Sequence, residues 1–297
     1  MSKVINKSVL LIHGGATNLK FVNNKNRIEY VNHLKGIIRK AGTRLINGEF
    51  SIDVVVQAVK DLENCELFNA GRGAVLNEIG KVSLEASLME GKLKYFGSIL
   101  NASNIRNPIL LCENILTTQN RLILSNKGVE KYAKENNFDL VDNSYFITPL
   151  RKEYWSNKKL EEQCFGTVGA VALDIHGNLC SGTSSGGISN KILGRIGDSG
   201  LIGSGTFADN KTCAISCTGD GEYFIQNNVS YRISSLIELK NLSIKNAIKK
   251  VIKEVKNTGG QGGIIGVDKL GNYWCEFTTK GMYRGIFSKE IIKIEIE

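Results

Sequence analysis

Thr167 and Ser185 are hydroxyl residues near the two ends of one glycine-rich segment, GTVGAVALDIHGNLCSGTSSGG, which covers residues 166–187. Small and apolar residues alternate in its first half, and residues 174–178 have the composition of a turn, so the segment predicts two antiparallel strands. If the hairpin is centred on His176, Thr167 lies opposite Ser185, with Cβ atoms about 4.5–5.5 Å apart. A register shift of one residue would put the hydroxyls on opposite faces. The pair is therefore either an ordinary cross-strand contact or a nucleophile with a hydroxyl partner.

Thr167 directly follows Gly166, an order that suits a nucleophile able to generate its own base. The chain has three histidines. We expect them in a turn (His176), on a helix (His33) and at a strand end (His13), which are poor places for a catalytic base. An N-terminal threonine needs no histidine, because its α-amino group, with a pKa of about 7.7–8.0, takes the hydroxyl proton. An internal threonine gains that amine only if the preceding peptide bond is cut, and a glycine there tolerates the strained backbone. The order therefore favours self-cleavage between Gly166 and Thr167.

Two segments further along the chain contain groups that such a nucleophile would require. The segment GRIGDSG places Arg195 and Asp198 among glycines, a cation and an anion suited to the carboxylate and the ammonium group of an amino acid. The segment CTGDGE places Thr218 and Gly219 at a strand end, where a hydroxyl and a backbone N–H can converge on an oxyanion. A surface ion pair and a helix-capping turn are the structural alternatives.

The composition indicates a folded chain without a membrane span. The 297 residues are 42% apolar, enough for a sizeable core in one domain or two. The apolar runs are far shorter than the ~18–20 residues of a membrane-crossing helix. The run VLLI near the start is also shorter than the apolar region of about 7–15 residues in a signal peptide. We therefore expect a cytoplasmic protein with no membrane partner.

Cysteine spacing and charge exclude two further classes of function. The seven cysteines show no paired CxxC spacing, so reduced thiols are expected in place of a metal cage. The net charge of +9 could indicate a nucleic-acid partner. The lysines of residues 243–256 lie opposite an apolar stripe, however, and no basic patch alternates with aromatic residues. We therefore expect no nucleic acid.

The hydrophobic pattern predicts the elements that position these residues. Residues 9–15 form a buried strand that runs into a glycine turn, and Ser51 is expected to cap a helix. Residues 71–100 are predicted as consecutive strands, and residues from about 120 to 164 as a polar connector with few regular signals. Strands grouped between helices predict two sheets with helices outside. The remaining expected elements are a helix from Pro108, a strand over 212–221, two helices, and a hairpin over 264–277.

The segment from Gly166 to Ile225 resembles the central part of the plant-type asparaginases and isoaspartyl peptidases. This resemblance implies an α+β fold, a four-layer αββα sandwich of the N-terminal-nucleophile hydrolase type, formed by residues 1–297 as one domain. It also implies self-cleavage into residues 1–166 and 167–297, the alpha and beta subunits, and association of two such heterodimers. The matching segments outside the centre are IHGGA (12–16), LENCELFNAGRGAV (62–75), LEASLMEG (84–91), RNPI (106–109) and FTTKGMYRG (277–285).

The resemblance also assigns the main roles in catalysis and binding. By this resemblance, Thr167 is the nucleophile that forms a covalent acyl intermediate, its α-amino group is the base, and Ser185 hydrogen-bonds it. Arg195 and Asp198 would hold the α-carboxylate and α-amino groups of the substrate. That substrate would be L-asparagine or a β-aspartyl dipeptide, and no cofactor is implied for catalysis.

Further residues near the site follow from the same resemblance. Thr218 and Gly219 would form the oxyanion hole and contact the substrate. Asn69, in the segment FNAG, and the neighbouring Asp220 and Gly221 are expected to border the substrate. The loop LENCELFNAGR also resembles one that holds a structural sodium ion. Its ligands would be the backbone carbonyls of Leu62, Glu63, Cys65, Phe68, Ala70 and Arg72.

Four positions depart from the pattern of the family. Phe165 precedes Gly166 where a polar residue is common, which bears on the rate of self-cleavage. Ser185 stands where threonine is usual, so the hydroxyl is kept and the methyl that restricts its rotamer is lost. Asp220 stands where several isoaspartyl peptidases have another threonine, which places a carboxylate beside the oxyanion hole. Glu85 replaces the aspartate of a segment of the type LDAS. None of these changes removes a catalytic element.

Two alternatives remain open from the sequence. Glycosylasparaginases share the threonine, arginine and aspartate elements, but they are typically secreted or lysosomal, and neither a signal nor a disulfide pattern is visible here. A dinucleotide-binding protein is a second alternative, because GSGTFA over residues 203–208 fits G-x-G-x-x-A and Glu222 follows 19 residues after Gly203. That motif requires a helix directly after it. The sequence DNKTCAISC alternates like a strand instead.

Overall fold

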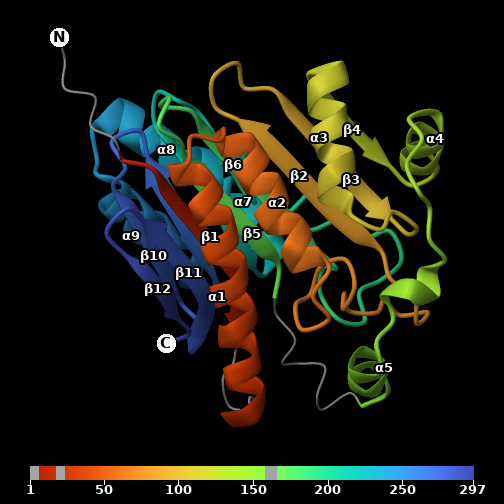
Figure 1. Ribbon diagram of the computed structural model, residues 1–297. Helices are drawn as coiled ribbons and strands as arrows, with labels where there is room; N and C mark the ends of the chain where they lie inside the picture. Colours follow the sequence, from red (N-terminus) through yellow and green to blue (C-terminus); the bar gives the residue numbers. More distant parts are fainter. Residues whose placement is uncertain (1–6, 18–23, 158–165) are drawn as a thin grey trace.

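The computed structural model describes residues 7–17, 24–157 and 166–297 and shows a mixed α+β fold built on two sheets (Figure 1). In the described residues the larger sheet has eight strands in the order β12-β11-β1-β5-β6-β2-β3-β4, antiparallel throughout except for the β3–β4 pair. Its strands are β1 (Val9–Thr17), β2 (Leu84–Glu90), β3 (Phe96–Ala102), β4 (Arg121–Ser125), β5 (Val168–Leu173), β6 (Leu179–Ser185), β11 (Gly281–Ser288) and β12 (Ile292–Glu295).

The smaller sheet has four strands in the order β10-β9-β8-β7 and packs against the larger one through contacts of β8 and β9 with β1, β5 and β6. Helices α1, α2 and α3 contact the larger sheet, and α7, α8 and α9 lie on the smaller one. The strands are β7 (Thr206–Ala208), β8 (Cys213–Gly219), β9 (Gly262–Asp268) and β10 (Tyr273–Phe277). The helices are α1 (Asn24–Ile46), α2 (Ser51–Glu63), α3 (Pro108–Gln119), α7 (Gly221–Asn227), α8 (Val229–Lys240) and α9 (Ile244–Asn257).

Strand β1 is apolar throughout its first half because both of its faces are covered. Leu10 and Ile12 belong to the core between the larger sheet and its helices. Val9 and Leu11 belong to a second core between the two sheets. A strand buried on both faces has no polar side to present, which explains the continuous run VLLI.

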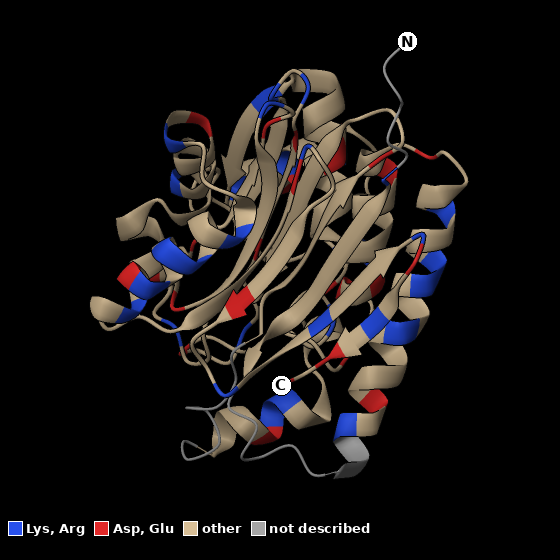
Figure 2. Ribbon diagram, turned by 90° about the vertical axis from the view of Figure 1, so that its left-hand side faces the viewer, with Lys and Arg blue, Asp and Glu red and all other residues tan. Residues whose placement is uncertain are grey.

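Helix α9 confirms the predicted division into an apolar stripe and a lysine face. Ser243 caps it by accepting a hydrogen bond from the backbone N–H of Asn246. The apolar stripe is buried, while Lys245 and Lys249 lie over the ring of Trp274 on the outside. Figure 2 shows Lys and Arg mainly on helices and turns around largely uncharged strands. Among the described residues, no helix is both long and apolar enough to cross a bilayer.

Three sequence predictions about the elements were wrong. Residues 71–83 form turns, because their backbone groups bond to side chains such as Asn69 and Asn77 and not to a neighbouring strand. Ser51 does not cap α2; Phe50 occupies that position, and the Ser51 N–H donates to Asp174. The supposed connector contains β4, α4 (Lys127–Glu135), a 3₁₀ turn (Asn143–Phe146) and α5 (Pro149–Ser156). Residues 158–165 of that connector lie outside the described residues.

The C-terminal half also has more elements than expected. Three helices, α7 to α9, follow β8 where two were predicted, and β11 and β12 follow the hairpin of β9 and β10. The segment GSGTFA leads into β7 and then β8, with no helix directly after it. The dinucleotide-binding alternative is therefore excluded on its own criterion.

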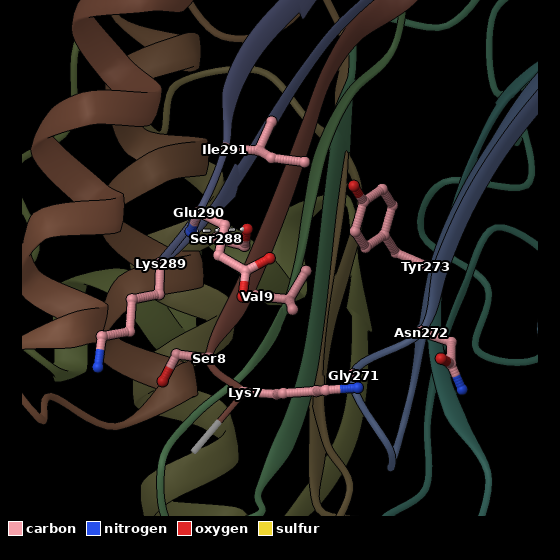
Figure 3. Close-up of a pocket in the computed structure, with 10 residues that line it drawn as sticks. All are labelled: Lys7, Ser8, Val9, Gly271, Asn272, Tyr273, Ser288, Lys289, Glu290 and Ile291. Atoms are coloured by element: carbon pink, nitrogen blue, oxygen red, sulfur yellow. Dashed lines mark hydrogen bonds between the residues drawn. The ribbon is translucent and has the colours of Figure 1, made fainter. Parts of the chain in front are cut away.

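A cavity of about 380 Å³ opens between the sheets where β1 begins (Figure 3). It is flanked by Val9, by Tyr273 at the start of β10 and by Ile291 between β11 and β12. Val9 pairs with Leu173, the last residue of β5, whereas Thr167 precedes the first residue of that strand. The cavity is therefore at the opposite end of β5 from the predicted nucleophile.

Candidate active site

The hairpin of β5 and β6 has the predicted register. Val168 pairs with Ser184, which continues the symmetry about His176 and places Thr167 opposite Ser185. The two hydroxyl oxygens, Thr167 Oγ1 and Ser185 Oγ, are 2.9 Å apart and buried. The contact that the sequence predicted is therefore confirmed. It depends on regular strand pairing, because a shift by one residue would place Ser184 on that face.

Ser185 and Ser199 hold the Thr167 hydroxyl from two sides. The backbone N–H of Gly187 donates to Ser185 Oγ at 2.9 Å, which fixes the serine rotamer. Ser199 Oγ lies 3.4 Å from Thr167 Oγ1. Sequence reasoning missed Ser199, although its place directly after Asp198 was a usable signal. The nucleophile candidate thus has two hydroxyl neighbours from different segments.

The peptide bond before Thr167 is held by glycine and asparagine backbone. The Asn69 N–H donates to the carbonyl oxygen of Gly166 at 3.2 Å. A Cβ added at Gly15, whose φ is +105°, would lie 2.2 Å from Gly166 Cα, so only glycine allows this approach. The side chain of Asn69 is fixed in turn by donating to Gly187 O at 2.7 Å and accepting from Val75 N at 2.9 Å. The Gly166 carbonyl is therefore polarised by an N–H donor.

Arg195 points its guanidinium at an acidic residue. Its Nε and Nη2 each lie 2.8 Å from a carboxylate oxygen of Glu222, in a bidentate pair. The Arg195 side chain is 9% exposed and that of Glu222 is 59% exposed. Burial alone would lower the pKa of Arg195, but the hydrogen bonds and charge of Glu222 raise it. Glu222, noted above for its spacing after the segment GSGTFA, thus occupies the group expected to bind the substrate carboxylate.

Asp198 is a buried carboxylate with spare acceptor capacity. It is 3% exposed, and within the described chain its Oδ2 has no hydrogen-bond partner. Gly205 and Gly221 pack against it closely, since a Cβ on either would lie 2.9 Å from an Asp198 oxygen. Burial, followed by the charge of Glu85, raises the pKa of Asp198 to about 7. An unpaired buried acceptor of this kind is suited to an ammonium group.

Gly219 borders the site at the end of β8, and its neighbours lie behind it. Its φ is +148°, and a Cβ there would lie 2.3 Å from Gln261 O, so the position requires glycine. Thr218 is fully buried, and its Oγ1 accepts a bond from Ala16 N at 3.3 Å. The Asp220 carboxylate accepts from Gln261 N at 2.8 Å and is therefore turned towards that loop.

One cavity joins most of the predicted residues. It measures only about 10 Å³, close to the space that one water molecule requires. The uncut chain therefore has no room for an amino acid at this place. Asn69 and Gly221 touch lining residues from behind. The predicted residues that line the cavity are Gly166, Thr167, Ser185, Arg195, Asp198 and Gly219, and the additional ones include Glu85, Gly187 and Ser199.

A chain of buried polar side chains alternates between the two sheets near the candidate nucleophile. It begins at His13, which is fully buried and whose pKa burial lowers to about 3, so the imidazole is neutral. It ends at Ser87, which donates to Ser199 O at 2.6 Å. Such a network is stable in a core only when its members satisfy one another. The contacts are His13–Ser216 at 2.9 Å, Ser216–Thr183 at 2.7 Å, Thr183–Thr206 at 2.6 Å and Thr206–Ser87 at 2.8 Å.

Two backbone carbonyls in the loop after α2 already accept a hydrogen bond. Glu63 O accepts from Arg72 N at 2.7 Å, and Cys65 O accepts from Phe68 N at 3.4 Å. A carbonyl oxygen has two lone pairs, so each retains one for a cation. Among the described residues, no cluster of three or more His, Cys, Asp or Glu side chains could hold a metal ion. Any ion in this loop would therefore be held by backbone oxygens.

Comparison with known proteins identifies the family. A family model described as asparaginase matches residues 6–296. The chain is 38% identical to an isoaspartyl peptidase of Escherichia coli over 94% of its own length and 92% of that protein. It is 37% identical to a putative isoaspartyl peptidase/L-asparaginase of Dictyostelium discoideum, covering 94% and 93% of the two chains. It is 36% identical to the isoaspartyl peptidase/L-asparaginase of Mus musculus, covering 92% and 86%. The chain therefore belongs to the asparaginase family of hydrolases.

Proposed function

We propose that this protein cuts its own chain before Thr167 and then hydrolyses β-aspartyl dipeptides and L-asparagine with that threonine. The observation that carries the proposal is the contact of 2.9 Å between the hydroxyls of Thr167 and Ser185, directly after a glycine whose carbonyl is bound by an N–H donor. The names of the relatives support the substrate class, since they combine isoaspartyl peptidase and L-asparaginase.

Self-cleavage begins when Thr167 Oγ attacks the carbonyl carbon of Gly166. The Asn69 N–H, 3.2 Å from that carbonyl oxygen, stabilises the negative charge that develops on it. The C–N bond breaks, the nitrogen takes a proton, and an ester links Gly166 to the threonine oxygen. Water then cleaves the ester, which leaves a carboxylate on Gly166 and a free α-amino group on Thr167.

Hydrolysis of substrate uses the amine that cleavage releases. The neutral amine of Thr167 accepts the hydroxyl proton while Oγ attacks the side-chain carbonyl of the substrate. Ser185 donates a hydrogen bond to Oγ, and Gly219 N–H with the Thr218 hydroxyl is proposed to stabilise the oxyanion. The ammonium gives its proton to the leaving nitrogen, which departs as ammonia or as an amino acid. Water then hydrolyses the acyl-threonine and releases aspartate.

Recognition of the aspartyl part is assigned to the buried charges beside the nucleophile. Arg195 would bind the α-carboxylate through its planar guanidinium after Glu222 yields part of its bidentate contact. Asp198, whose Oδ2 has no partner in the described chain, would bind the α-ammonium group. Asn69, Asp220 and Gly221 would border this subsite. The cavity of about 10 Å³ must enlarge first, which is the expected result of releasing the chain before Thr167.

We extend the proposal to the whole molecule on the basis of family membership. The fold is proposed to be a four-layer αββα sandwich of the N-terminal-nucleophile type, forming one domain over residues 1–297. After cleavage the alpha and beta subunits would stay together, since β5 lies between β1 and β6 in one sheet, and two heterodimers would associate. The described cysteines are all unpaired thiols, which supports a cytoplasmic location.

A structural sodium ion is part of the proposal and takes no part in the reaction. The backbone carbonyls in the loop after α2 that retain a lone pair would bind the ion. The positive charge of the ion would order the loop. The proposed ligands are the carbonyls of Leu62, Glu63, Cys65, Phe68, Ala70 and Arg72.

The function is tested with purified full-length protein. A denaturing gel with mass spectrometry should show fragments that end at Gly166 and begin at Thr167, and the cleaved protein should release aspartate from a β-aspartyl dipeptide and from L-asparagine. Thr167→Ala protein prepared in parallel is the control and should do neither. Aspartate release by an uncut chain would contradict the free-amine mechanism. Release of aspartate from N⁴-(N-acetylglucosaminyl)asparagine alone would favour the glycosylasparaginase alternative.

A further inference from the structure

Glu85 is a buried carboxylate beside the candidate site that the mechanism above does not use. It lies on β2, paired with Ser185 on β6, and is 0% exposed. It lines the same small cavity as Thr167 and Asp198. Burying a carboxylate is costly unless it is paired and hydrogen-bonded, so its partners indicate its role.

Both oxygens of Glu85 bind the middle of the substrate-binding segment. The backbone N–H of Gly197 donates to Oε1 at 3.1 Å and to Oε2 at 3.0 Å. Gly197 stands between Arg195 and Asp198 in the chain. A Cβ at Gly197 would lie 3.2 Å from Glu85 Oε2, so glycine allows the carboxylate to approach. Glu85 therefore fixes the backbone that carries both groups proposed to bind the substrate.

Lys191 is a buried cation paired with Glu85. It is 3% exposed, and its Nζ lies 3.8 Å from Glu85 Oε1 and donates to Ser83 O at 2.9 Å. Burial, only partly offset by the charge of Glu85, lowers the pKa of Lys191 to about 8. The charged groups in and beside the cavity are two cations, Arg195 and Lys191, and three carboxylates, Glu85, Asp198 and Glu222. When all five are ionised, one negative charge has no counter-charge.

We propose that Glu85, anchored by Lys191, is a positioning residue that fixes the segment of Arg195 and Asp198 and supplies the negative charge that selects ligands with an α-ammonium group. The proposal rests on the proposed function and adds a specificity determinant to it. The α-ammonium group of the substrate provides the positive charge that the subsite lacks. A ligand with the same carboxylates but no ammonium group leaves that charge unbalanced in a dry site.

The charge of Glu85 should also be visible in the pH dependence of binding. The charged and titratable groups around Asp198 are Glu85 on β2, Arg195 on its own segment, Glu222 on α7 and the buried thiol of Cys217 on β8. Burial and then Glu85 raise the pKa of Asp198 to about 7. As pH falls through about 7, Asp198 of the wild type takes up a proton, and its preference for a ligand with an ammonium group should weaken. When the charge of Glu85 is removed, the same weakening should occur at a lower pH.

The test compares L-aspartate with succinate, which is the same molecule without the amino group. Both are measured as competitive inhibitors of dipeptide hydrolysis across pH, and the ratio of their inhibition constants reports recognition of the ammonium group alone. For Glu85→Gln we expect this preference to fall about tenfold above pH 8, the effect of losing one close charge. The pH at which the preference weakens should fall as well. Self-cleavage should persist, which shows that the variant folds.

Two further variants separate charge from position. Glu78→Gln is the matched control, because Glu78 Oε1 accepts from Leu193 N at 2.7 Å and holds the same segment from outside the cavity. Its inhibition ratio should equal that of the wild type. Glu85→Asp keeps the charge but withdraws it from Gly197, so both inhibitors should weaken together while their ratio is kept.

An unchanged ratio and an unchanged pH midpoint in Glu85→Gln would overturn the inference while leaving the proposed function intact. A wild-type protein that releases no aspartate from any aspartyl amide would overturn the function itself. If Glu85→Gln yields no folded protein, Glu85→Asp decides. Weaker binding of both inhibitors at an unchanged ratio supports the inference, and inhibition constants equal to those of the wild type overturn it.

Discussion

The proposed nucleophile and the charges proposed to bind substrate are positioned by different means. Thr167 and Ser185 are neutral hydroxyls whose positions follow from strand pairing in the middle of the larger sheet. Arg195 and Asp198 are charges on a segment without regular structure, held by one buried acid, Glu85, and one exposed acid, Glu222. The backbone ladder fixes the first pair, and side-chain electrostatics fix the second.

This difference indicates how each part should respond to substitution. A strand position is defined by many backbone hydrogen bonds, so losing one hydroxyl should alter chemistry and leave geometry intact. A segment held by a few buried ionic contacts should change its affinity when any of them is lost, because each remaining charge is then unpaired. Separate effects on kcat and KM distinguish the two regions.

Thr167→Ala should have the largest effect, because it removes the attacking atom of both reactions. We expect no self-cleavage and no hydrolysis, measured by gel and by aspartate release. Thr167→Ser should retain part of both activities, since it keeps the hydroxyl and loses only the methyl that restricts its rotamer. Full activity in Thr167→Ala would place the nucleophile elsewhere.

Arg195→Ala should lower kcat/KM for a β-aspartyl dipeptide about 1000-fold, the effect of losing a buried charged contact. The loss should be mainly in KM, and the chain should still cut itself. Steady-state kinetics on cleaved protein measure this. If self-cleavage also stops, Arg195 supports the fold and the contrast between the two regions fails.

Ser185→Ala should lower kcat by roughly 10- to 1000-fold, corresponding to about 1.4–4 kcal/mol of transition-state stabilisation. Slow self-cleavage should persist, because Ser185 neither attacks nor leaves. Ser184→Ala is the matched control, since the neighbouring residue faces away from Thr167 and should leave kcat unchanged. Equal losses in the two variants would mean that packing of β6, and not the hydroxyl, is responsible.

Glu222→Gln should have the smallest effect of these variants, and it should strengthen substrate binding where the others weaken activity. Glu222 competes with the substrate carboxylate for Arg195, and its side chain is 59% exposed. Removing its charge should lower KM by about two- to fivefold, the range of a partly exposed ion pair. A large rise in KM would show that Glu222 is needed to orient Arg195.

The sequence predicted the nucleophile pair because alternation and a turn define a register. It could not show that Glu85 reaches Gly197, because this contact joins residues 112 positions apart through side-chain length alone. It also misassigned residues 71–83, most of whose apolar residues are buried in turns held by asparagine side chains. Helix α4 was missed because only Val129 and Ala133 of its residues are buried, too few to show a helical period.

The bond before Thr167 is surrounded by residues from three well-separated parts of the chain. Gly15 packs on Gly166, Asn69 binds its carbonyl, and Ser199 lies beside the threonine hydroxyl. During synthesis on the ribosome these partners become available only after most of the chain has emerged and the two sheets have met. Under the proposed mechanism, the cut would then record that assembly is complete, and a chain that misfolds would remain whole and inactive.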